Sequence, residues 1–237
     1  VSRIVEYKDA SEQERSITFC NSGVICAKAE VLFSLLEVVG NDNASGEYYL
    51  TDIVQLANDR NLSVAAVHCD EAETMGINSR AELAQAEASF QTRTRAEMMA
   101  LGVSLTAPET VYFAYDTVLG RDSQIEPNVV FGPGVTVENS AHIRAFSHLE
   151  GCHVSSGAVV GPYARLRLGT ELAENVRIGN FVEVKNARIE DGAKVNHLSY
   201  IGDASIGAGS NIGAGTITCN YDGVSKHRTA IGAAVFV

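Results

Sequence analysis

Residues 160–184 read V-GPYARL-RLGTEL-AENVRI-GNFVEV, and an aliphatic residue closes each group of six. These residues are Val160, Leu166, Leu172, Ile178 and Val184. A spacing of six fits neither the 3.6-residue period of an α-helix nor the alternation of a long β-strand. It is typical of hexapeptide repeats, in which each hexad supplies one short strand and one turn.

The repeat extends in both directions from this stretch. Between residues 119 and 212, 27 of 94 positions are Val, Ile, Leu or Phe, so chance would fill about five of the 17 repeat positions with these types. All 17 positions hold one of them. With three steps of five residues, the other repeat positions are Leu119, Ile125, Phe131, Val137, Ile143, Leu149, Val154, Ile189, Val195, Ile201, Ile206 and Ile212.

This pattern predicts a parallel β-helix. Three hexads, about 18 residues, close one triangular coil. We expect the repeat positions to point inward and to stack on their equivalents in the next coil. Glycine often follows a repeat position, and we expect it to let the backbone turn the corner.

The first part of the chain lacks this period and indicates part of an α/β layer. The sequence predicts short strands within residues 16–27, a helix over 29–39 and a strand over 62–67. A long helix is predicted over 79–101, between a cap at Asn78-Ser79 and Gly102. The predicted domains are therefore residues 1–80, a linker helix at 81–101 and the β-helix at 102–237.

The composition narrows the function classes. Lys and Arg number 18 against 29 Asp and Glu, a formal charge of −11, which argues against a nucleic-acid partner because cations bind phosphate backbones. No run of about 18 apolar residues occurs, so no membrane span is expected. The five cysteines show no CxxC or zinc spacing, and we interpret them as reduced thiols of a cytosolic protein.

Two cations are spaced by one full coil. Arg167 and Lys185 each follow an inward position and are 18 residues apart, so we expect them to stack on adjacent coils and point outward. Two neighbouring cations suit a bound anion such as a phosphate. The alternative is two solvated surface charges, paired with Glu183 or Glu171.

Polar residues on the following coils extend this cluster. His197, Tyr200 and Asn211 are expected close to the same stack, and a neutral imidazole can take a proton near pH 7 from an attacking amine. The alternative is a hydrogen-bonded structural histidine. Residues 219–229 contain no inward position, so they are expected to loop away from the β-helix. This loop is locally basic and suits a nucleotide-like phosphate, or it is a plain surface insertion or a trimer contact.

With these residues in view, the chain resembles the bifunctional bacterial N-acetylglucosamine-1-phosphate uridyltransferase / glucosamine-1-phosphate N-acetyltransferase family over essentially its whole length. The hexapeptide repeat alone is weak, because many acyltransferases share it. The resemblance rests on IVEYKDA at 4–10, NSG at 21–23, GEYYLTD at 46–52, GINSR at 76–80, GPYARLR at 161–167, GNFVEVK at 179–185, NHLSY at 196–200 and GAGTITCNYDG at 213–223.

The resemblance implies an acetyltransferase site in a left-handed β-helix of a cytoplasmic homotrimer. Arg167 and Lys185 would hold the phosphate of glucosamine 1-phosphate, and His197 would be the general base. The amine would attack acetyl-CoA, the co-substrate. Tyr200 and Asn211 would contact the sugar, while Ala214, Asn220 and Tyr221 would line the acetyl-CoA side, with the Asn220 amide able to stabilise the oxyanion.

The resemblance also implies a uridyltransferase site in a Rossmann-like nucleotidyltransferase domain. This second activity would convert UTP and N-acetylglucosamine 1-phosphate into UDP-N-acetylglucosamine and diphosphate. Glu6, Asn21 and Asn78 match residues that hold the UDP-sugar, and Asn78 also matches a ligand of the catalytic Mg²⁺. Tyr49 and Thr51 would touch the sugar.

The chain departs from the family pattern in three places. The family's Gly-rich nucleotide loop, catalytic Lys and metal-binding Asp precede the first residue, and its last coils follow residue 237. We therefore expect an internal fragment without uridyltransferase activity and with weak or absent acetyltransferase activity. Leu168 stands where the family commonly has Pro.

Three other functions stay open at this point. The β-helix could serve only the assembly or regulation of a sugar nucleotidylyltransferase, or the chain could be a trimerisation scaffold without activity. It could also be a simple acyltransferase for another amine, although the GEYYLTD stretch argues against that.

Overall fold

The computed structural model describes residues 1–237, which form two compact units, Val1–Ala86 and Glu87–Val237. Each unit is described by itself. None of the helices in either unit is both long enough and apolar enough to cross a membrane.

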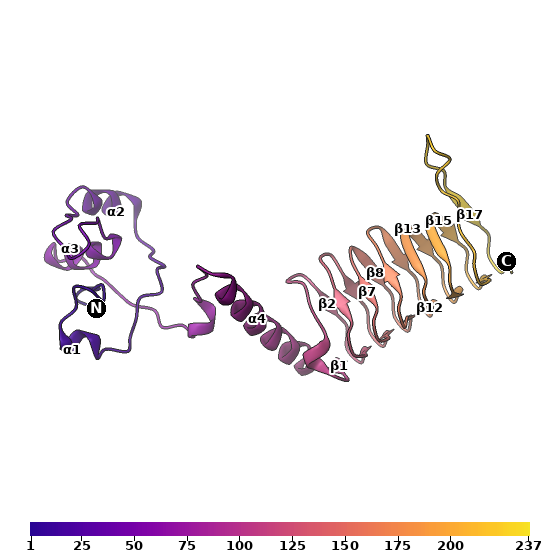
Figure 1. Cartoon of the computed structure of the whole chain (residues 1–237), viewed down its shortest axis with the longest axis horizontal. Helices are drawn as coiled ribbons and strands as arrows, with labels where there is room; N and C mark the ends of the chain where they lie inside the picture. The colour runs from indigo at the N-terminus through magenta and orange to yellow at the C-terminus, as the bar shows by residue number, and fades with distance from the viewer. The chain divides into compact units, whose positions relative to one another are not determined.

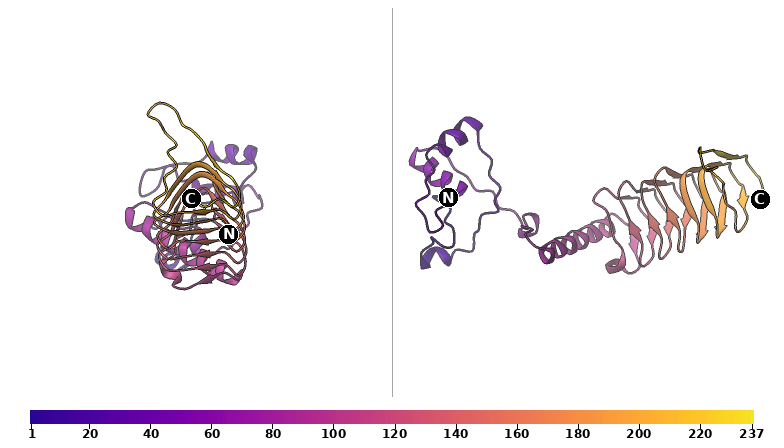
Figure 2. Two further views of the ribbon diagram at one scale, coloured as in Figure 1. Left: turned by 90° about the vertical axis from the view of Figure 1, so that its right-hand side faces the viewer. Right: turned by 45° about the horizontal axis from the view of Figure 1, so that its top comes forward.

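The second unit is a parallel β-helix, as the six-residue period predicts (Figure 1). Short parallel strands follow one another around each coil and pair with the equivalent strands one coil away, so the coils stack in a regular row (Figure 2, right). One sheet holds seven strands: β1 (Ser104–Leu105), β3 (Gln124–Ile125), β6 (His142–Ile143), β9 (Val159–Val160), β12 (Arg177–Asn180), β14 (Lys194–His197) and β16 (Asn211–Ile212).

The second sheet covers two faces of the β-helix. The two rows of strands on these faces join at β13, which pairs with both β10 and β11. The seven residues of β13 pass over the corner at Asn186. Its strands are β2 (Val118–Leu119), β4 (Val130–Phe131), β5 (Thr136–Val137), β7 (His148–Leu149), β8 (Cys152–Val154), β10 (Arg165–Leu166), β11 (Thr170–Leu172), β13 (Glu183–Ile189), β15 (Tyr200–Ile206) and β17 (Thr229–Ile231).

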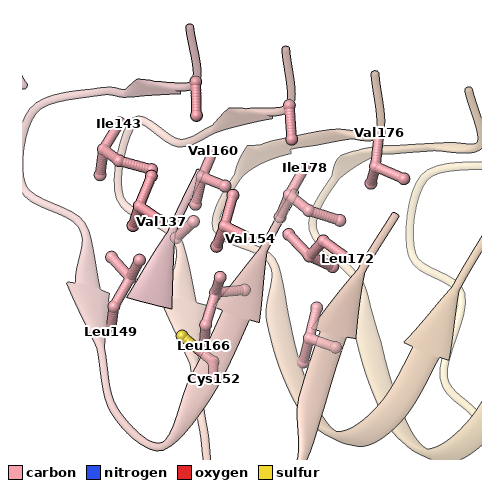
Figure 3. Packing of buried hydrophobic residues seen from close by; sticks show 14 of the residues in the cluster. Val137, Ile143, Leu149, Cys152, Val154, Val160, Leu166, Leu172, Val176 and Ile178 are labelled. Carbon is pink, nitrogen blue, oxygen red and sulfur yellow. The ribbon is translucent and has the colours of Figure 1, made fainter. Parts of the chain in front are cut away.

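The core of the β-helix consists of the repeat positions. All 17 are buried, with exposed fractions of 7% or less, which confirms that they point inward. Burial of one such side chain stabilises the fold by about 1.5–3 kcal/mol. Equivalent residues lie in rows along the shaft, as Figure 3 shows for Ile143, Val160 and Ile178 and for Val137, Val154 and Leu172.

Of the glycines that follow repeat positions, Gly161 has the positive φ (95°) expected at a turn, but most have a different role from the predicted one. At most corners the residue with positive φ is not glycine, as at Phe181 (55°) and Leu198 (46°). Gly179 instead lies against the next coil, and an added Cβ there would meet the Asn196 carbonyl oxygen at 2.0 Å. Glycine is therefore required at this position for close packing of two coils rather than for the turn.

The long predicted helix is confirmed as α4 (Arg80–Ala100), which ends before Gly102 at φ +94°. Gln91 of this helix is 3% exposed. Its side chain donates to the Phe113 carbonyl oxygen at 2.7 Å and accepts from the Phe113 N–H at 3.0 Å. Arg95 Nε donates to the Val111 carbonyl oxygen at 2.9 Å. Side chains of α4 thus provide the first coil with the backbone hydrogen-bond partners that a preceding coil would otherwise provide. The first coil also contains the short helix η3 (Pro108–Thr110).

The first unit contains helices and loops without a strand. Its elements are α1 (Glu12–Arg15), α2 (Ala29–Leu36), η1 (Leu50–Asp52), α3 (Ile53–Asp59) and η2 (Glu71–Glu73). Its buried residues are Leu35, Ile53 and Ala57, between α2 and α3. The helix predicted over 29–39 is confirmed, although it ends three residues earlier than predicted.

The prediction of strands over 16–27 and 62–67 is wrong, because neither segment forms the backbone hydrogen bonds of a β-sheet with any other part of the unit. A strand needs a neighbour for its N–H and C=O groups, and an apolar run does not provide one. The Rossmann-like assignment, the exact domain bounds and the linker role of α4 stay predictions.

Candidate functional site

The two cations lie on adjacent coils, as their spacing predicts. In the pairing of β10 with β13, Arg165 lies opposite Glu183 and Leu166 opposite Val184, and the Arg167 N–H donates to the Val184 carbonyl oxygen at 2.9 Å. Arg167 therefore stands beside Lys185. On the next coil Lys185 lies opposite Gly202 of β15.

Tyr200 occupies the space that Gly202 leaves open. A Cβ at residue 202 would lie 2.3 Å from the Tyr200 hydroxyl oxygen, so the phenol ring lies over this glycine. Because Gly202 is the register partner of Lys185, the phenol oxygen reaches the row of the two cations. The local sequence Tyr-Ile-Gly thus brings a hydroxyl group to the cation row.

The cations differ in their partners. Arg167 Nη1 lies 2.8 Å from Glu183 Oε1, and both side chains are about one-third exposed. The ion-pair alternative is therefore confirmed for Arg167. Lys185 forms no ion pair within 4.0 Å in the chain, so its charge is available to an anion from solution.

His197 ends β14, in the other sheet, and the corner at Leu198 separates it from Tyr200. It is exposed, and its Nδ1 lies 3.1 Å from Oδ1 of Asn180, its register partner one coil earlier in β12. His197 therefore lies on the face of the β-helix that adjoins the row formed by Arg167, Lys185 and Gly202, here called the cation row. Asn180 was not among the predicted site residues, although its spacing of 17 residues from His197 could have indicated it.

Asn211 is not beside the cations, contrary to the prediction. It lies in β16 opposite Lys194, on the face of His197. The reason is its distance along the chain: 26 residues separate it from Lys185, which is not a whole coil. Ala214 follows the same pairing of β14 with β16 and comes one coil after His197, while its role on the acetyl-CoA side stays a prediction.

The loop between β16 and β17 projects from the β-helix as predicted (Figure 1 and Figure 2, left). Its hairpin has Tyr221 opposite Lys226, and Asp222 accepts from the backbone N–H of Ser225 at 2.7 Å. This hydrogen bond, with a second from the His227 ring, lowers the pKa of Asp222 to about 2. The Tyr221 hydroxyl donates to the Gly223 carbonyl oxygen at 2.7 Å, and the residue is 60% exposed.

Asp203 joins this loop to the cation row, and the sequence reasoning missed it. Its carboxylate accepts from the side-chain amides of Asn186 and Asn220, both at 2.5 Å. These hydrogen bonds, with the attraction of Lys226 and Lys185, lower its pKa. The signal was present, because residues 186, 203 and 220 are 17 apart.

The amide of Asn220 is already engaged, which changes its predicted role. Its Nδ2 donates to Asp203 and lies 3.4 Å from the Tyr200 hydroxyl oxygen. An amide group has two N–H bonds, so both have partners here. Its side-chain N–H groups are therefore not free to donate to an oxyanion, and its carbonyl oxygen, which only accepts hydrogen bonds, cannot replace them.

The residues predicted to bind a UDP-sugar lie in the first unit and come together only in part. Glu6 and Tyr49 line a hollow of about 340 Å³, and Glu6 Oε1 accepts from the Thr51 hydroxyl at 3.3 Å. Asn21 and Asn78 are exposed and lie outside this lining.

Asn78, the predicted magnesium ligand, is not accompanied by a cluster of other metal-binding side chains in the chain. No group of three or more His, Cys, Asp or Glu residues in the chain could hold a metal ion, and Asn78 offers a single amide oxygen. The residues present thus do not make up a magnesium site by themselves, and the role of Asn78 stays a prediction.

Comparisons with known proteins give a clear sequence relationship. No family model matches the chain. The protein named Bifunctional protein GlmU from Ruegeria pomeroyi is 74% identical over 237 residues, covering 100% of this chain and 53% of that protein. The protein of the same name from Jannaschia sp. is 64% identical over 235 residues, covering 99% of this chain and 52% of that protein.

Solved structures are more distant. The acetyltransferase domain of PglB from Neisseria gonorrhoeae in complex with acetyl coenzyme A is 17% identical and covers 55% of this chain and 58% of that chain, with a TM-score of 0.38. LpxA from Bacteroides fragilis, a UDP-N-acetylglucosamine acyltransferase, is 12% identical and covers 50% of this chain and 54% of that chain, with a TM-score of 0.29. In sequence, therefore, this chain is a relative of the proteins named Bifunctional protein GlmU, and it spans about half their length.

Proposed function

We propose that the β-helix carries a site that transfers the acetyl group of acetyl-CoA to the amine of glucosamine 1-phosphate. The observation that carries this proposal is the unpaired Lys185 beside Arg167 on adjacent coils, with the Tyr200 hydroxyl in the same row. A sugar phosphate supplies both the anion for the cations and hydroxyl groups for Tyr200. The resemblance of the GPYARLR and GNFVEVK motifs supports the same substrate.

The chemistry needs a base near the sugar amine. His197 takes one proton from the amine as the nitrogen attacks the thioester carbonyl carbon. A C–N bond forms, the carbonyl oxygen gains negative charge, and the C–S bond then breaks to release coenzyme A. The proton on His197 balances the thiolate that leaves. Ala214, one coil from His197, and the exposed Tyr221 ring would face the acetyl-CoA side.

The whole protein is proposed to have a second activity, the uridylyl transfer from UTP to N-acetylglucosamine 1-phosphate that yields UDP-N-acetylglucosamine. Glu6, Asn21 and Asn78 would hold the UDP-sugar there, and Mg²⁺ is expected at that site. The left-handed sense of the β-helix, a homotrimer and a cytoplasmic location belong to the same proposal.

The test mixes the purified whole protein, rather than the span of residues 1–237 alone, with acetyl-CoA and glucosamine 1-phosphate and follows the release of free thiol. Replacing His197 by Ala should lower the rate about 10²- to 10⁴-fold, because a general base is lost. Arg177→Ala is the matched control, since Arg177 is exposed on β12 and makes no ion pair. Equal rates of thiol release for His197→Ala and the unaltered protein would contradict His197 as the base, and no release by either protein would favour a scaffold.

A further inference from the structure

His197 differs from the other paired histidines in its acceptor. In the same unit, His142 lies 2.8 Å from Glu126, His153 lies 2.9 Å from Glu138 and His227 lies 2.7 Å from Asp222. A carboxylate partner favours the protonated, cationic imidazole. The partner of His197 is the neutral amide of Asn180, at 3.1 Å.

An amide oxygen accepts hydrogen bonds and cannot donate them. Because Oδ1 of Asn180 faces Nδ1 of His197, the ring proton of the neutral imidazole must lie on Nδ1. The lone pair is then on Nε2, the nitrogen without a protein partner. The neutral amide sets the tautomer without the attraction that a carboxylate would give to the cation.

The surrounding charges leave this arrangement intact. Arg177 in β12 and Lys194 in β14 are cations on the strands that carry the pair. The acidic groups of β13 and β15 that flank the cation row have partners of their own, since Glu183 is paired with Arg167 and Asp203 accepts from two amides. Across the corner, the cation row adds Lys185 and the phenol of Tyr200.

We propose that Asn180 is a positioning residue that fixes the Nδ1–H tautomer of His197 and so presents Nε2 as the base. The inference rests on the proposed acetyl transfer for its purpose, but the tautomer itself is a property of the chain alone. The backbone supports it, because both residues lie at paired positions of two adjacent strands.

Nuclear magnetic resonance of the chain with ¹⁵N-labelled histidine tests the tautomer directly. The spectrum of His197→Gln identifies the signals of residue 197 among the six histidines. At a pH where the ring is neutral, we expect a protonated Nδ1 and a bare Nε2. Asn180→Asp keeps an acceptor and should keep this tautomer, while Asn180→Ala and Asn180→Leu should shift the population toward Nε2–H.

The other histidine signals report whether each variant is folded, and Arg177→Ala serves as the control on the same strand. An Nε2–H tautomer in the unaltered chain, or no change in both Asn180→Ala and Asn180→Leu, would overturn the inference. Acetyl transfer by the whole protein provides the second readout, with kcat lowered about tenfold in Asn180→Ala and the KM for glucosamine 1-phosphate little changed. If the tautomer responds but no acetyl transfer occurs in any protein, the proposed function fails and the positioning role stands.

Discussion

The β-helix and the first unit show what a periodic sequence does that an aperiodic one does not. In the β-helix every repeat position is buried, and each coil provides the backbone partners of the next. In residues 1–86 only Leu35, Ile53 and Ala57 are buried, and residues such as Val24 and Val67 are 76% and 90% exposed. Apolar residues therefore determine structure when their spacing also supplies neighbours for the backbone.

The largest expected effect on stability separates the two regions. Ile178→Ala should lower the free energy of unfolding by about 2–5 kcal/mol, because it leaves a cavity between stacked coils. Val67→Ala should change it by less than about 0.5 kcal/mol, because that side chain is exposed. Urea unfolding followed by circular dichroism measures both. Similar losses for the two variants would remove the contrast between the regions.

The next effect tests the role of glycine in the coil contact. Gly179→Ala should cost about 1–3 kcal/mol or more, because the new methyl group would overlap the Asn196 carbonyl oxygen. Gly192→Ala is the matched control for space, since nothing lies within 4 Å of a Cβ there, although its φ of +64° adds some strain. A smaller shift in the urea midpoint for Gly179→Ala than for Gly192→Ala would show that glycine serves the turn instead.

A third effect concerns the end of the shaft that α4 covers. Gln91→Leu keeps the size of the side chain but leaves the buried N–H and C=O of Phe113 without partners, which should cost about 1–3 kcal/mol. Gln85→Leu, at an exposed place earlier in the same helix, is the comparison. Equal urea midpoints for the two variants would mean that the hydrogen bonds from α4 do not stabilise the first coil.

The smallest effect is a pH dependence at the base of the loop. The pKa of Asp203 is lowered in the folded chain, so its contribution to stability is present above the ordinary Asp pKa of about 3.9 and is lost as pH falls through the folded value. The urea midpoints of the unaltered chain and Asp203→Asn should therefore differ at pH 6 and converge below about pH 4. A constant difference across this range would exclude the charge of Asp203 as the cause.

The sequence predicted the fold of the β-helix and the adjacency of Arg167 and Lys185, because both follow from counting residues along coils. The predictions from the sequence failed at positions that counting residues along the coils does not place. Asn211 was expected close to the cation stack because it lies on a following coil, but it is not a whole number of coils from Lys185. The strand over 62–67 was inferred from an apolar run, which says nothing about a pairing partner.

Asn180 and Asp203 were missed for a different reason. Their roles depend on which atom of a neighbour each side chain meets, His197 Nδ1 in one case and two amide groups in the other. Spacing by one coil brings such residues together, but it does not say which hydrogen bonds they form.

The most direct test of the proposed site is the affinity for glucosamine 1-phosphate, measured by titration calorimetry. We expect the chain to bind it, and Lys185→Ala and Arg167→Ala each to weaken binding about tenfold or more, since each removes a charge-assisted contact with the phosphate. Arg177→Ala should bind as the unaltered chain does. No binding by the unaltered chain, or equal affinity in all four proteins, would contradict a sugar-phosphate site on these coils.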